Sequence, residues 1–215
     1  MKKTRRQFIK EFIVGTGAFI AGSRSIAAAT AKLPLRAADL DFLTLHVNLK
    51  RRREWTDHQP APLMMREAGE YDRITVHHIG RVTNYHTVVN SVIHDLRGVL
   101  VSHAKRGYGD IGYHFIVDYA GRVWEGRSLA YEGAHVAHEN ERNIGVTFLG
   151  NFEHQKPSGA QLETLRKIVP LLTEHYGVKT GRIYGHRDLG STVCPGKTLY
   201  PHVVRMRRAV VSEVP

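Results

Sequence analysis

Segments with the hydrophobic period of a β-strand alternate along this chain with segments that have the period of a helix. Residues 73–77 alternate with β-branched side chains, as a strand does, whereas the apolar residues of 87–100 recur at helical spacing. The runs 114–118 and 122–124 flank a short turn that contains Gly, which is typical of a hairpin. Interleaved strands and helices with at least one hairpin predict an α/β fold with a mixed sheet.

The second half of the chain continues this alternation. A capping box of Ser158 and Gln161 predicts the start of a helix that Gly177 ends, and Pro170 should kink that helix near its middle. The other predicted elements are a loop at 56–70, a buried strand at 143–149, a short strand at 182–184 and a closing helix at 198–213. We therefore expect a single domain whose central mixed β-sheet is flanked by helices.

The composition narrows the class of protein. With 215 residues, of which 42% are hydrophobic and 24% charged, the chain has the composition of a globular protein with a sizeable core. Its single Cys excludes a disulfide framework and a four-cysteine zinc cluster. The sequence contains no apolar run of about 18 residues, so we do not expect a polytopic membrane protein. No internal repeat is visible, so residues from about 36 onward are expected to form one domain.

The first 31 residues have the pattern of an export signal. A basic start precedes a weakly apolar stretch at 12–21, and Ala29-Thr30-Ala31 offers a cleavage site. The segment Thr4–Lys10 (TRRQFIK) resembles a twin-arginine signal. We expect export by this route to the periplasm or cell envelope, or secretion, with only transient membrane contact. Two alternatives stay open: a basic start that merely touches anionic lipid, and an uncleaved signal that remains as an anchor.

The chain is basic, with 31 Lys and Arg residues against 20 Asp and Glu residues and a formal net charge of +11. Without residues 1–31 the excess falls to about +6, which fits an anionic polymer, either nucleic acid or cell-wall glycan. The sequence contains no zinc-finger spacing, helix-turn-helix pattern or RNA-binding aromatic signature, and Arg51-Arg52-Arg53 is a short run typical of a solvated surface. We therefore expect no nucleic-acid partner.

Two segments carry residues suited to a metal ion. His77 ends the first predicted strand, and His186 and Cys194 lie eight residues apart near the other end of the domain. Imidazole nitrogen and thiolate sulfur are ligands of Zn²⁺, and a catalytic zinc site combines three protein ligands with one open position. Each residue alone also has an ordinary explanation, as a hydrogen-bonded histidine or a small buried cysteine. Together they form a candidate zinc set.

The sequence around these residues resembles a known family. The matching blocks, in chain order, are Arg53-Glu54-Trp55, Ile74–His78, Asp110–Phe115, Gly121–Arg127, Gly133-Ala134-His135, Asn140, Ile144-Gly145-Val146, Gly185-His186 and Cys194-Pro195. This order is similar to that of the peptidoglycan recognition proteins and the bacteriophage-type zinc N-acetylmuramoyl-L-alanine amidases. The resemblance implies the type 2 amidase fold over residues 51–215, with residues 32–50 as an N-terminal extension.

The resemblance also implies a reaction and its residues. Zinc held by His77, His186 and Cys194 would assist water in hydrolysing the amide between N-acetylmuramic acid and L-alanine of peptidoglycan or muropeptides. Tyr113 takes the position of the catalytic tyrosine and would orient the water or donate to the oxyanion. Thr192 replaces the lysine of the phage amidases and offers a weaker donor, which leaves the stabilisation of the oxyanion less well defined. No general base stands out in the sequence.

Further positions are implied to contact substrate. They are His103, Tyr108, His135 and Asn140, and Tyr108 replaces the Trp that is usual in relatives preferring a diaminopimelate stem. His78 and His114 adjoin site residues, so we expect their rings to pack away from the site. The alternative function is a recognition module that binds peptidoglycan without cutting it. Such modules commonly lack the cysteine that this chain retains as Cys194.

Overall fold

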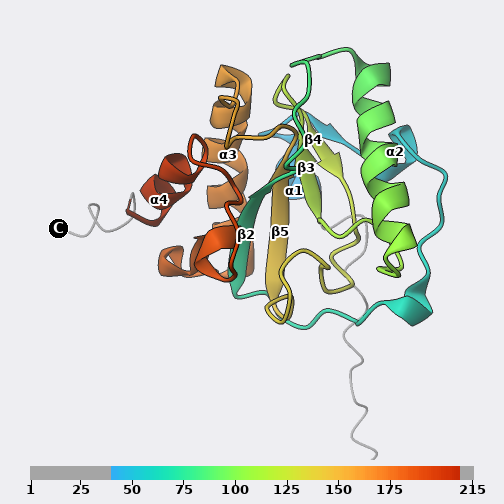
Figure 1. The fold of residues 1–215 in the computed structure, drawn as a ribbon. Coiled ribbons are helices and arrows are strands. Elements are labelled where there is room, and N and C mark those ends of the chain that lie inside the picture. Colours follow the sequence, from blue (N-terminus) through green and yellow to red (C-terminus); the bar gives the residue numbers. More distant parts are fainter. Residues whose placement is uncertain (1–39, 209–215) are drawn as a thin grey trace, which may run out of the picture. The chain divides into compact units, whose positions relative to one another are not determined.

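A six-stranded sheet in the order β1-β4-β3-β5-β2-β6 organises the fold of this chain (Figure 1). The computed structural model describes residues 40–208, which belong to one compact unit, Leu33–Pro215. The strands are β1 (Leu49–Lys50), β2 (Arg73–His78), β3 (Phe115–Val117), β4 (Val123–Glu125), β5 (Asn143–Phe148) and β6 (Ile183–Gly185). Only β3 and β4 pair antiparallel, as the predicted hairpin, so the sheet is mixed as expected.

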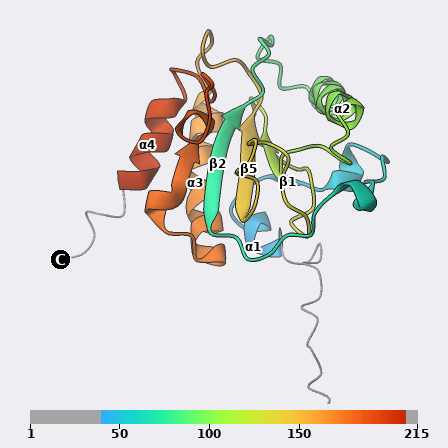
Figure 2. The same cartoon turned by 60° about the horizontal axis from the view of Figure 1, so that its bottom comes forward.

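Helices lie on both sides of this sheet. Figures 1 and 2 show α2 (Val89–Lys105) on one side and α3 (Gly159–Tyr176) on the other, with α4 (Tyr200–Arg208) beside α3. A short helix, α1 (Asp41–Thr44), and four 3-10 turns complete the described elements: Arg52–Glu54, Pro62–Met64, Thr180–Arg182 and His186–Asp188. Among the described residues, no helix has the length and apolarity needed to cross a bilayer.

The two long helices form where the periodicity predicts them. The inward face of α2 consists of Val92, Leu96, Val99, Leu100 and His103, all of which are buried. In α3 the hydroxyl of Ser158 accepts the N–H of Gln161, and the side chain of Gln161 returns to the N–H of Ser158. The helix continues through Pro170 and ends at Gly177, whose φ of 65° is left-handed.

Several local expectations need adjustment. The loop at 56–70 contains a 3-10 turn that begins at Pro62, where a missing N–H costs no helical hydrogen bond. The expected extension 32–50 contributes α1, with Leu43 buried, and β1, which pairs with β4. The export signal and residues 209–213 of the predicted closing helix lie outside the described residues.

Side-chain alternation along β2 and β5 separates a polar face from an apolar one. The register pairs Thr75 with Gly145 and His77 with Thr147, so these side chains share one face. The opposite face carries Ile74, Val76, Ile144, Val146 and Phe148, all in the core. Both strands are fully or nearly fully buried, which is why β5 reads as an apolar run in the sequence.

Candidate metal centre

Three candidate ligands converge at the carboxyl end of the central strands. One nitrogen each from His77 and His186 and the sulfur of Cys194 lie within 4.8 Å of one another. Sγ of Cys194 is 3.7 Å from Nδ1 of His77, and the rings of His77 and His186 have centroids 4.7 Å apart. The structure therefore brings together the set that donor chemistry picked out in the sequence.

Strand pairing explains how two of these residues meet. Strands β2 and β6 run parallel, with Val76 opposite Gly185, so His77 and His186 each follow a paired position at the same edge. The turn after β6 is held by Asp188, whose Oδ2 accepts the N–H of Gly185 at 2.7 Å and whose Oδ1 accepts the hydroxyl of Tyr200 at 2.6 Å. These bonds fix the direction in which the chain leaves the strand.

The third ligand is fixed by main-chain contacts. The N–H of His78 points to Sγ of Cys194 at 3.4 Å, and the carbonyl of Cys194 accepts the N–H of Arg187 at 2.8 Å. The hydroxyl of Thr192 accepts the N–H of Cys194 at 3.2 Å. Thr192 is exposed and lies two residues before the candidate ligand Cys194, and in this contact its hydroxyl acts as an acceptor.

Burial sets the protonation of these groups. His77 is 1% exposed, and desolvation, assisted by His135 and His186, lowers its pKa well below the usual range. Burial also lowers the pKa of His186. For the thiol of Cys194, burial raises the pKa to about 12, against smaller opposing effects of the His78 main chain and Arg187. The imidazoles are thus neutral, and the thiol holds its proton until something stabilises the thiolate.

This donor set fits zinc. Two neutral imidazoles and one thiolate are ligands that a borderline-soft ion prefers, and three protein ligands leave a fourth position for water or substrate. A cation next to the sulfur also removes the cost of a buried thiolate. His77, His186 and Cys194 are the residues that would hold the ion.

Tyr113 lies beside the candidate ligands. Its ring centroid is 5.2 Å from that of His77. Burial, with a smaller effect of Cys194, raises the pKa of Tyr113 above its usual value, and the nearby Thr147 hydroxyl acts in the opposite direction. The phenol therefore keeps its proton at neutral pH and can act as a hydrogen-bond donor.

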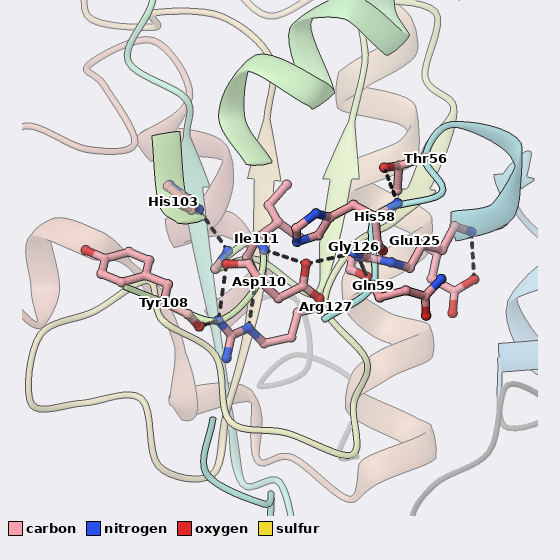
Figure 3. Close-up of polar contacts among 12 residues, drawn as sticks. Thr56, His58, Gln59, His103, Tyr108, Asp110, Ile111, Glu125, Gly126 and Arg127 are labelled. Atoms are coloured by element: carbon pink, nitrogen blue, oxygen red, sulfur yellow. Dashed lines mark hydrogen bonds and ion pairs between the residues drawn. The ribbon is translucent and has the colours of Figure 1, made fainter. Parts of the chain in front are cut away.

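A buried arginine organises the segment that leads to Tyr113 (Figure 3). The guanidinium of Arg127 donates to the carbonyls of Tyr108, Ile111 and Glu132 at 2.6, 2.8 and 3.0 Å, and to that of Asp110 at 3.4 Å. Because one side chain satisfies four carbonyls, it fixes the course of this segment.

The same segment is also held from two other sides. The carboxylate of Asp110 accepts from Arg52 at 2.8 Å and from the N–H of Ile111 at 2.7 Å. Nδ1 of His103 accepts the N–H of Gly112 at 2.8 Å. The position of Tyr113 thus depends on residues from the start of the domain, from α2 and from the strand β4 region.

The four residues predicted to contact substrate fall into two groups. Tyr108 and Asn140 line a pocket of about 400 Å³, together with Met64 and Arg66. Oδ1 of Asn140 also accepts the N–H groups of His135 and Val136, at 2.8 and 2.9 Å.

The other two are buried histidines. His103 lies with its ring 5.3 Å from that of Tyr108 and 5.5 Å from that of Tyr113, and burial lowers its pKa to about 4. His135 lies against His77, with 3.0 Å between Nδ1 of His135 and Nε2 of His77. Contact of all four residues with substrate stays a prediction.

His78 and His114 pack as expected. Nδ1 of His78 accepts the N–H of Phe152 at 3.0 Å, and Nδ1 of His114 accepts the N–H of Gly145 at 2.9 Å. Burial lowers the pKa of each to about 4. Both rings serve the packing around the centre, and neither belongs to the three-ligand group.

Sequence reasoning assigned no role to Thr147, Arg127 or Asp110. Arg127 and Asp110 lie inside the matching blocks. The sequence alone does not indicate that Arg127 binds main-chain carbonyls or that Asp110 pairs with Arg52. For Thr147 a signal existed, because a hydroxyl that alternates with apolar residues in a buried strand needs a polar neighbour.

Comparison with known proteins identifies a family and several relatives. Residues 67–197 match the family model described as N-acetylmuramoyl-L-alanine amidase. Peptidoglycan-recognition protein SC2 of Drosophila simulans is 32% identical over 130 residues, which cover 60% of this chain and 70% of the relative. Human N-acetylmuramoyl-L-alanine amidase is 39% identical over 97 residues, which cover 44% of this chain and 17% of the relative.

Solved structures share the fold. Drosophila peptidoglycan recognition protein SD has a TM-score of 0.64 at 24% identity, covering 79% of this chain and 95% of that chain. The complex of tracheal cytotoxin with the ectodomains of peptidoglycan recognition proteins LCa and LCx gives a TM-score of 0.63 at 28% identity, covering 78% of this chain and 96% of that chain. The expected fold class is confirmed.

Proposed function

Since the chain belongs to the N-acetylmuramoyl-L-alanine amidase family, we propose that it is a zinc-dependent amidase that cuts the bond between N-acetylmuramic acid and L-alanine. The observation that carries this proposal is the complete ligand group, in which donor atoms of His77, His186 and Cys194 lie within 4.8 Å of one another. Two imidazoles and a thiol that converge in this way are zinc ligands, and three of them leave a position open for catalysis, which supports hydrolysis over binding alone.

The chain's own residues supply the remaining chemistry. A bound zinc ion would polarise the amide carbonyl and lower the pKa of a coordinated water. Tyr113 keeps its proton because burial raises its pKa, so its O–H donates to the oxygen on which negative charge develops. Hydrolysis adds one water across the amide, which leaves the lactyl carboxylate on the sugar and the free amine on L-alanine. Thr192, two residues before Cys194, would offer a second and weaker donor, since its hydroxyl accepts the N–H of Cys194 and keeps its own O–H to donate.

The proposed substrate is a muropeptide or the peptidoglycan polymer. The LCa–LCx ectodomain complex, at 28% identity, contains tracheal cytotoxin, and the pocket lined by Tyr108 and Asn140 lies on the domain that matches it. Tyr108 occupies the position of an aromatic wall in relatives that favour a diaminopimelate stem, so we propose that stem type. Export through residues 1–31 would bring the enzyme to this substrate in the periplasm or cell envelope.

The alternative is a recognition module without hydrolytic activity, since several relatives are named recognition proteins. Incubation of the purified protein with a muramyl tripeptide, followed by mass spectrometry, separates the two. We expect release of the stem peptide that stops after full zinc removal by a chelator and returns when zinc is added. Tight binding without release would favour the recognition module, and release that survives zinc removal would contradict the metal mechanism.

A further inference from the structure

The imidazoles of His77 and His135 form a path of close contacts from the sulfur of Cys194 to a main-chain carbonyl. Nδ1 of His77 faces Sγ of Cys194 at 3.7 Å, and Nε2 of the same ring lies 3.0 Å from Nδ1 of His135. Nε2 of His135 in turn lies 3.1 Å from the carbonyl oxygen of Asn143. All three side chains that form this path are buried.

The direction of each hydrogen bond follows from the fixed end of the path. A carbonyl oxygen only accepts, so Nε2 of His135 must carry the proton. In a neutral imidazole the other nitrogen is then an acceptor, so Nδ1 of His135 takes the Nε2–H of His77. This leaves the lone pair of His77 on Nδ1, the nitrogen that faces Cys194.

We propose that His135 is a positioning residue, which fixes the tautomer and ring orientation of His77 so that Nδ1 is presented to a metal ion. The proposal rests on the metal centre of the proposed function. It assigns His135 a role different from the substrate contact expected from the sequence. Ligating histidines are commonly oriented by a partner on their other nitrogen, and loss of that partner typically weakens metal binding about 10–100-fold.

The surroundings hold the ring of His135 in this pose. A Cβ added to Gly133 would lie 2.2 Å from Cδ2 of His135, and one added to Gly145 would lie 2.4 Å from the same atom. Both positions need glycine because the ring occupies the space of a side chain. The main chain of His135 is fixed as well, since its N–H donates to Oδ1 of Asn140 at 2.8 Å.

The acceptor at the end of the path is fixed too. Asn143 begins β5, and its side chain accepts from the hydroxyl of Thr75 at 2.9 Å and donates to the carbonyl of Glu139 at 2.7 Å. Strand pairing with β2 ties this residue to the strand that carries His77. The carbonyl and the ligand thus belong to one rigid sheet, and His135 bridges them.

The test compares zinc affinities, measured by competition with a chromophoric chelator, for the full-length protein and three variants. We expect His135→Leu to weaken zinc binding about 10–100-fold. His135→Asn should retain most of the affinity, because its Oδ1 can replace Nδ1 as the acceptor for His77. His114→Leu removes a neighbouring buried histidine that contacts no ligand, and should bind zinc like the unaltered protein.

The tautomer of His77 provides a second measurement, read from long-range ¹H–¹⁵N NMR correlations in the metal-free protein. The Nε2–H form should dominate in the unaltered protein and in His135→Asn, and be depleted in His135→Leu. Unchanged zinc affinity in His135→Leu, equal losses in His114→Leu, or an Nδ1–H form in the unaltered protein would each overturn the proposal. A protein that binds zinc but releases no stem peptide would contradict only the proposed amidase activity.

Discussion

Sγ of Cys194 lies 3.7 Å from Nδ1 of His77, although 117 positions separate the two residues in the chain. The cysteine is therefore the residue whose removal tests the metal centre most directly. We expect Cys194→Ala to lose zinc and stem-peptide release together, because two imidazoles alone make a weak site. Zinc content by elemental analysis and turnover of a muramyl tripeptide are the measurements. His94→Ala, on the exposed side of α2, is the control, and near-normal turnover in Cys194→Ala would contradict the ligand assignment.

The phenol of Tyr113 should act on the reaction rather than on the metal. We expect Tyr113→Phe to lower kcat about 10²–10³-fold, as removal of one oxyanion donor typically does, with zinc affinity and KM nearly unchanged. Steady-state kinetics and the chelator competition measure these quantities side by side. Tyr184→Phe serves as a matched control from outside the ligand group, on strand β6. A variant without the phenol that turned over normally would exclude Tyr113 from the chemistry.

Proton release on zinc binding should report the state of the thiol. The pKa of Cys194 is raised to about 12, so the thiol is protonated in the metal-free protein at neutral pH and must lose its proton to become a ligand. The pKa values of His77 and His186 are lowered, so both rings are already neutral and release none. Apparent zinc affinity should therefore rise at least about tenfold per pH unit between roughly pH 7 and 9. Calorimetry in buffers of different ionisation enthalpy should give one proton per zinc from the thiol, with a second only where a zinc-bound water also ionises. A value of zero would contradict a protonated thiol.

Arg127 should be a determinant of stability. Its guanidinium donates to four buried or partly buried main-chain carbonyls, which lose this donor if the side chain is replaced by methionine. We expect Arg127→Met to lower the free energy of unfolding by about 3 kcal/mol or more, measured by urea denaturation. Arg166→Met, at an exposed position of α3, should change it by less than about 0.5 kcal/mol. Equal stabilities of the two variants would show that the carbonyls find other partners.

The amino-terminal segment should direct export. Replacing Arg5 and Arg6 by lysine should retain the protein in the cytoplasm, because the twin-arginine route depends on the arginine pair. Cell fractionation followed by immunoblotting measures the distribution. An unaltered distribution between compartments would assign residues 1–31 to another function.

Much of the fold follows from local patterns. Residues 89–105 form a helix because their apolar side chains repeat at helical spacing, and Ser158 and Gln161 cap α3 as the capping box predicts. The two-residue strand β1 gave no such signal, since it exists only through its pairing with β4. Short elements of this kind depend on tertiary contacts that periodicity does not encode.

The sequence allowed the metal ligands of the candidate site to be predicted, but not the residues that orient those ligands. His77, His186 and Cys194 carry donor chemistry that distinguishes them in the sequence, and the structure brings their donor atoms together. The relation between His135 and His77 could not be predicted, because it depends on a ring position for which Gly133, two residues away, and Gly145, on strand β5, both leave room. The residue type alone does not distinguish a histidine that binds substrate from one that orients another histidine.

The three candidate ligands come from the end of β2, the turn after β6 and the loop before α4. A nascent or truncated chain that lacks the parallel pairing of these strands would offer isolated donors with no common geometry. Metal capture would then be the last step of maturation, after the whole sheet has formed. Retained zinc in a purified preparation would serve as a reporter of how many molecules have reached the native state.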